Sequence, residues 1–114
     1  MRCNMIHGGG GPKIITGSYT GDGTATRTIS LGVHPEMVLV LCAEYSIGDP
    51  YSDAYGGMAS RDWPAKTYNW RREIAAVTDN GFVVHNKTSS STNDPYSDVN
   101  ANTSGLHYNY VVFY

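Results

Sequence analysis

With 114 residues, a formal net charge of −2 and 16% charged residues, the chain has the size of one domain. It lacks the clustered basic residues of a nucleic-acid-binding surface, so we expect no nucleic-acid partner. No apolar run approaches the ~20 residues of a membrane helix, and the first residues lack the apolar core of a signal peptide. We therefore expect neither membrane insertion nor export through such a signal.

The chain begins with a segment that has no capacity to pack. Four consecutive glycines, Gly8 to Gly11, precede Pro12 and favour neither a helix nor a strand. We expect residues 1–12 to form a flexible arm and residues 13–114 to form a single domain. Residues 14–19 and 26–31 alternate and are rich in β-formers, with Gly21-Asp22-Gly23 between them. This pattern predicts a β-hairpin.

The middle and the end of the chain contain further strand patterns. Residues 36–44 enclose the most continuous apolar run, which is typical of a central strand covered on both faces. Residues 73–77 and 82–87 flank a Thr-Asp-Asn-Gly turn and predict a second hairpin. Residues 107–114 predict a well-anchored last strand with Tyr108, Tyr110 and Val112 on one face. The fold class is therefore all-β, an antiparallel sandwich of six or seven strands.

Two long segments, residues 45–70 and 88–106, interrupt the strands and are rich in polar and aromatic residues. Loops of this length in a compact domain are usually functional or disordered. Each segment contains the same pentapeptide, Asp-Pro-Tyr-Ser-Asp, at residues 49–53 and 94–98. The repeat is typical either of shared turn chemistry or of a shared binding role. We expect both copies on exposed loops.

These loops hold the candidate binding residues. Aromatic rings offer flat faces to a sugar ring or a protein surface, although the tryptophans would equally cover the open end of a sandwich. The aromatic candidates are Tyr51, Tyr55, Trp63, Tyr68, Trp70 and Tyr96. Flexible loops with several carboxylates suit calcium. The candidate ligands are Asp49, Asp53, Asp94 and Asp98.

The sequence contains no motif for catalysis. Gly-x-Ser-x-Gly, His-Glu-x-x-His and phosphate-binding patterns are absent, and the four histidines are widely separated. Zinc ligands usually come in close pairs, so we expect each histidine to be a strand or turn residue. Cys42 lies within an apolar run and is typical of a small core residue. We expect a protein that is not an enzyme and needs no cofactor, with calcium as the alternative.

Two segments resemble bacteriophage tail-fibre and other virion appendage modules. The first is the glycine-rich stretch 16–23 followed by Ile29-x-Leu31-Gly32-x-x-Pro35 and a valine-rich strand. The second is the Asn-x-x-Gly turn that leads into Tyr108-x-Tyr110. The two segments bracket the domain. The chain departs from the pattern at Val33, where an aromatic residue is usual, and in its long middle segment.

The resemblance implies a virion structural protein, located in a tail fibre, baseplate or capsid surface and assembled in the host cytoplasm. Such modules associate with themselves, commonly as trimers, and with other virion proteins, and they present loops to a host-surface receptor such as a glycan. A rival reading is a carbohydrate-binding lectin of sandwich type, and a third is a secreted or host adhesion module.

Overall fold

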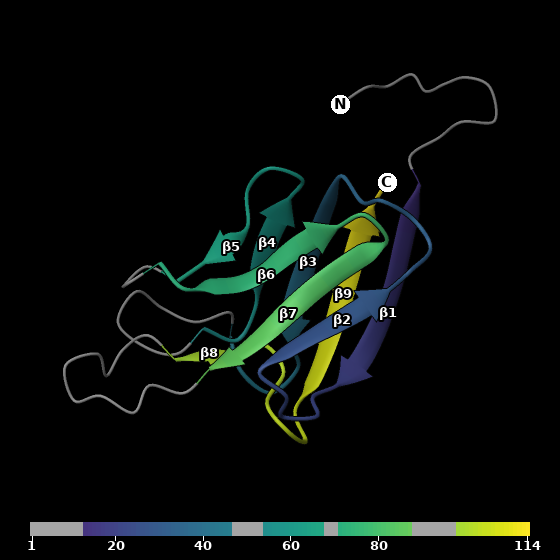
Figure 1. The fold of residues 1–114 in the computed structure, drawn as a ribbon. Helices are drawn as coiled ribbons and strands as arrows, with labels where there is room; N and C mark the ends of the chain where they lie inside the picture. The colour runs from purple at the N-terminus through teal and green to yellow at the C-terminus, as the bar shows by residue number, and fades with distance from the viewer. Residues whose placement is uncertain (1–12, 47–53, 68–70, 88–97) are drawn as a thin grey trace, which may run out of the picture.

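The computed structural model describes residues 13–46, 54–67, 71–87 and 98–114, and all regular structure in these ranges is β-strand (Figure 1). No helix that could span a bilayer occurs in the described ranges. The strands are β1 (Ile14–Thr20), β2 (Thr26–Ser30), β3 (Met37–Cys42), β4 (Gly57–Ser60), β5 (Ala65–Lys66), β6 (Glu73–Thr78), β7 (Gly81–Lys87), β8 (Val99–Asn100) and β9 (His107–Phe113).

The strands form two antiparallel sheets that pack face to face, as the two layers in Figure 1 show. One has the order β1-β9-β3-β4 and is called here the β9 sheet; the other has the order β2-β7-β6-β5, with β8 paired to β7, and is called the β7 sheet. The predicted all-β sandwich is confirmed. The strand number is higher than expected because short strands β4, β5 and β8 lie in segments that were predicted as loops.

The predicted hairpin of residues 14–19 and 26–31 is wrong. β1 pairs with β9 and β2 pairs with β7, so the two segments belong to opposite sheets. The chain crosses between the sheets at Gly21, whose amide donates to the Leu106 carbonyl at 2.8 Å. A Cβ at this position would lie 2.0 Å from the Thr103 carbonyl oxygen, so only glycine permits the approach. Alternation predicts strands but does not identify their partners.

The other strand predictions fare better. β6 and β7 form the second predicted hairpin, and β9 lies between β1 and β3 as the anchored last strand. β3 is central, between β9 and β4. The described residues cover it on one face only, because Val38 and Val40 are buried whereas Leu41 on the opposite face is 38% exposed. The expectation of burial on both faces is therefore wrong for one copy of the chain.

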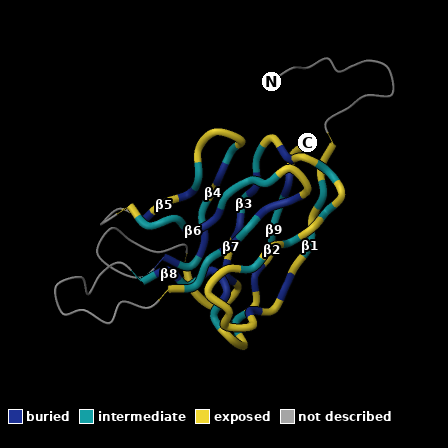
Figure 2. Tube along the Cα trace, viewed as in Figure 1, coloured by how far each residue is buried: buried dark blue, intermediate teal, exposed yellow. Residues whose placement is uncertain are grey.

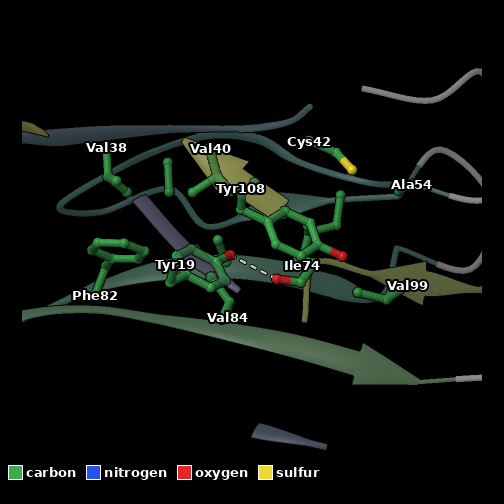
Figure 3. Close-up of a cluster of buried hydrophobic side chains, with 14 of the residues drawn as sticks. Tyr19, Val38, Val40, Cys42, Ala54, Ile74, Phe82, Val84, Val99 and Tyr108 are labelled. Carbon is green, nitrogen blue, oxygen red and sulfur yellow. Dashed lines mark hydrogen bonds between the residues drawn. The ribbon is translucent and has the colours of Figure 1, made fainter. Parts of the chain in front are cut away.

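The core lies between the sheets, where side chains of the two layers point toward one another (Figure 3). Exposed residues lie mainly in the loops at the two ends of the strands (Figure 2). The rings of Tyr19 and Tyr108 stack with centroids 4.9 Å apart. Gly17 lies opposite Tyr110 in the β1–β9 pair, and a Cβ there would lie 2.3 Å from the tyrosine oxygen. Because Gly17 has no side chain, the ring of Tyr110 packs directly over its backbone.

Candidate binding surfaces

The outer face of the β9 sheet is apolar at the end where β1 begins and β9 ends. The strand registers place Met37 opposite both Ser60 and Phe113, and Phe113 opposite Ile14. A bridge between Ser60 and Trp63 extends this row by one position. Directly paired residues point to the same face of a sheet. The first row of the face therefore runs Trp63, Ser60, Met37, Phe113, Ile14.

Two further rows follow along the strands. The second contains Met58, Leu39, Val111 and Thr16, and the third contains Leu41, Asn109 and Ser18. We call these three rows the apolar face. Seven large hydrophobic residues in the described ranges are exposed, and five of them lie on this face. Their exposed fractions are Trp63 74%, Met58 59%, Ile14 52%, Leu41 38% and Phe113 37%.

The apolar face contains no Asp, Glu, Lys or Arg, and charged groups lie only around its margin. Glu44 accepts a hydrogen bond from His107 at one end, and Arg61 pairs with Glu36 at the other. An apolar centre with a polar rim is the usual composition of a protein interface. Single exposed apolar residues are common on proteins, but a contiguous group of them marks an interaction site.

The outer face of the β7 sheet has the opposite character. Its middle row consists of Thr28, Val83 and Ala76. Beside this row, His85 contacts the Glu73 carboxylate at 2.7 Å and the Thr26 hydroxyl at 3.2 Å. None of the exposed large hydrophobic residues in the described ranges belongs to this face. The two sides of the sandwich are therefore chemically distinct, one suited to water and one suited to a partner.

Trp63, a predicted binding residue, is held on a rigid turn. Reciprocal backbone bonds join Ser60 and Trp63, with N···O distances of 3.0 and 3.1 Å. Between them, the guanidinium of Arg61 donates to the Pro35 and His34 carbonyl oxygens at 3.0 and 3.1 Å. Trp63 therefore does not cover the open end of the sandwich. Its ring is exposed, and the turn that carries it is already ordered.

Tyr55 lies at the other end of β4, where its ring stacks on that of Tyr45 with centroids 4.5 Å apart. Tyr55 is half-buried and packs against the core, whereas Tyr45 is 52% exposed. The structure therefore separates Tyr55 from Trp63, and sequence reasoning missed Tyr45. The other aromatic candidates, Tyr51, Tyr68, Trp70 and Tyr96, lie outside the described residues.

The residues that follow the two pentapeptide copies lie side by side. Ala54 follows the first copy and Val99 follows the second, and these two residues form a parallel bridge. The Ala54 amide donates to the Asp98 carbonyl at 3.0 Å, and both Ala54 and Val99 are buried. Of the four candidate calcium ligands, only Asp98 is described; Asp49, Asp53 and Asp94 lie outside the described residues. Among described side chains, no group of three or more metal-ligating residues occurs.

A polar cluster closes the end of the sandwich at which the chain crosses between sheets. Asn102 is fully buried, and its amide nitrogen donates to the Asp22 carboxylate at 2.6 Å and to the Thr24 carbonyl at 3.1 Å. Its amide oxygen accepts from the Asp22 amide and the Arg27 guanidinium, both at 3.3 Å. The Arg27 guanidinium also lies 5.2 Å from the centre of the Tyr19 ring. This cluster joins the β1–β2 and β8–β9 connections.

One group of side chains combines a thiol, a carboxylate and an imidazole. The Cys42 thiol donates to Glu44 at 3.6 Å, and the same carboxylate accepts from the His107 ring at 2.6 Å. The hydrogen bond from the His107 side chain is the main cause that lowers the pKa of Glu44. The shared carboxylate links the end of β3 to the start of β9.

Comparisons with known proteins found no relative. No family model matches the chain, and no curated protein or solved structure matches it significantly. The resemblance to virion appendage modules therefore stays a prediction.

Sequence reasoning missed the apolar face as a surface. The signal was present in residues 37–43 and 107–114, where apolar side chains occupy both faces of a strand. The sequence pattern alone favours an interior strand for such a run, because burial on both faces is the usual cause. Only the registers reveal that the second face of β3 and β9 lies on the outside of the sandwich.

Proposed function

We propose that this protein is a non-enzymatic structural module of a bacteriophage particle, in a tail fibre, baseplate or capsid surface, and that it self-associates. The observation that carries the self-association is the uncharged apolar face of the β9 sheet, with its five exposed large hydrophobic residues. Exposed apolar surface of this extent is costly in water and is usually covered by a partner.

The architecture also supports a role in display. The described connections at the ends of the strands are polar, and Ala54 and Val99, which follow the two Asp-Pro-Tyr-Ser-Asp repeats, are paired. A sandwich positions such loops without depending on their sequence. A host-surface glycan or another virion protein is the partner that we propose for the loops. The viral assignment rests on the resemblance of the glycine-rich stretch 16–23 and the Tyr108-x-Tyr110 strand.

The self-association is tested by the mass of the full chain in solution. We expect sedimentation velocity to give a multiple of the 12.4 kDa chain mass. Leu39→Glu places a charge in the middle of the apolar face and should give a monomer, because an unpaired charge is costly to bury. Thr28→Glu, on the outer face of the β7 sheet, is the matched control and should leave the mass unchanged.

A monomeric unaltered chain at all concentrations would refute self-association. The viral assignment has its own test, because an antibody against the chain should label purified particles of the virus that encodes it. Unlabelled particles would remove the viral assignment and leave the assembly result unaffected.

The second candidate is a carbohydrate-binding lectin, and the stacked pair of Tyr45 and Tyr55 favours it. Tyr45 keeps half of its surface exposed, and the stack fixes the ring without further ordering. An aromatic face of this kind binds the apolar side of a sugar ring. A monomer that binds glycans, and that loses this binding in Tyr45→Ala but not in Trp63→Ala, would favour the lectin over the assembly module.

A further inference from the structure

We infer that the partner of the apolar face is the same face of a second copy, related by a two-fold axis that runs along β3. This inference rests on the proposed self-association and adds the contact surface, the symmetry and the register. It commits to a dimer as the unit of assembly, in place of the trimer that the resemblance implies. Three properties of the face carry it.

The first property is burial. The continuous apolar run of β3 is typical of a strand covered on both faces, yet the described residues of one copy cover only one. Leu39 and Leu41 point outward from the centre of the β9 sheet. A second sheet packed on this side would complete the burial pattern that the sequence contains. Sheet-on-sheet packing is the way in which a flat apolar sheet face is usually covered.

The second property is charge. The three rows contain no Asp, Glu, Lys or Arg, so two copies meet without like-charge repulsion and without burying an unpaired charge. A basic or acidic partner would find no counter-charge within the rows. A second copy presents the same uncharged rows, so apolar side chains meet apolar side chains. When the same face of two copies forms the contact, the result is a closed two-fold dimer.

The third property is the order of large and small residues along the first row. With the axis on β3, Met37 faces its own copy, Trp63 faces Ile14 of the other copy, and Ser60 faces Phe113. A small side chain therefore lies opposite a large ring. In the second row, Leu39 faces its own copy. Sheet packing depends on this kind of interdigitation.

The area of the face, together with its rim, is of the size that a weak dimer buries. The three rows have five, four and three positions, so strands about 4.8 Å apart make the face about 19 Å wide on average, and six residues of β3 extend about 20 Å. The flat area is about 380 Å² per copy, or about 760 Å² for two, and the rim must supply the rest of the ~1,000 Å² that a specific interface needs. The polar rim adds to this area.

Trp63 is the expected anchor of the contact. Its ring is 74% exposed, and hydrogen bonds already hold the backbone of its turn, so burial orders only the two side-chain torsions of the tryptophan. Aromatic residues are frequent hot spots of binding energy. In a two-fold dimer one substitution removes the side chain from both copies, so two such contacts are lost. Trp63→Ala should weaken dimerisation by at least about 30-fold.

Thiol crosslinking tests the register. In a background of Cys3→Ser and Cys42→Ser, we expect Met37→Cys to crosslink to its own copy with a bis-maleimide that spans the ~10 Å between packed sheets. Leu39→Cys gives a second variant at the axis. Thr16 lies on the same face, two strands away from the axis on β3. The two copies of Thr16→Cys are therefore four strand spacings apart, about 19 Å along the face, and should not crosslink. Thr28→Cys on the β7 sheet is the control for random collision.

Sedimentation of the same variants separates the two proposals. Crosslinked Met37→Cys or Leu39→Cys at the mass of a dimer, with Thr16→Cys uncrosslinked, is the expected result. A trimer or larger assembly, or equal crosslinking of Thr16→Cys and Met37→Cys, overturns the two-fold contact and leaves self-association in place. A monomer with no crosslink at any position overturns both.

Discussion

Replacing Asn102 with alanine should be among the most destabilising single polar changes in the described residues. The amide is fully buried and makes hydrogen bonds to Asp22, Thr24 and Arg27. Alanine removes one bond to a charged carboxylate, worth about 1.5–3 kcal/mol, and at least one neutral bond worth about 1 kcal/mol. Water replaces part of the loss, because the Asp22 side chain is 49% exposed. The expected decrease in the free energy of unfolding is about 3 kcal/mol.

Urea unfolding followed by circular dichroism measures this decrease, and the melting temperature should fall by about 12 °C for a chain of this size. Ser30→Ala is the control, since it removes a polar side chain from an exposed position on β2, away from the apolar face. We expect the control to shift the free energy of unfolding by less than about 0.5 kcal/mol. Equal shifts in the two variants would refute the conclusion that the Asn102 cluster closes this end of the sandwich.

Three further predictions concern the same sheets and connections. Gly17→Ala should cost about 1–3 kcal/mol in urea unfolding because its Cβ clashes with Tyr110, and Tyr110→Leu should recover part of that cost. Gly105→Val should cost at least about 1 kcal/mol, because its φ of +86° disfavours a side chain although nothing lies within 4 Å of the added Cβ. Hydrogen bonds from Thr24 lower the pKa of Asp22 from 3.8 to about 2, so its carboxylate stabilises the fold above pH 4, and this contribution is lost between pH 4 and pH 2. In Asp22→Asn the urea midpoint should depend less on pH over that range. A pH dependence equal to that of the unaltered chain would contradict this role of Asp22.

Local patterns predicted the strands of this fold well and their partners poorly. The Thr-Asp-Asn-Gly turn and its flanks predicted β6 and β7 because a hairpin is a local structure. The same reasoning failed for β1 and β2, since the path of residues 20–25 depends on Gly21 approaching Thr103, more than 80 positions away in the chain. The buried Asn102 cluster has no local signal for the same reason.

The candidate site was predictable in part. Trp63 was selected as an aromatic loop residue, and it lies on a turn within the predicted loop. Its partners on the apolar face, such as Met58 and Phe113, were not selected, because membership of that face depends on the registers of four strands. A one-residue shift of any register would move these side chains to the other face.

The accessibility of Trp63 tests most directly whether self-association covers the apolar face. Acrylamide quenching of its fluorescence in a Trp70→Phe variant reports the exposure of this single ring, with the monomeric Leu39→Glu form as the reference. We predict that quenching decreases as the protein concentration rises, over the same range in which the mass increases. Quenching that equals the Leu39→Glu value at every concentration, while the mass increases, would contradict the account.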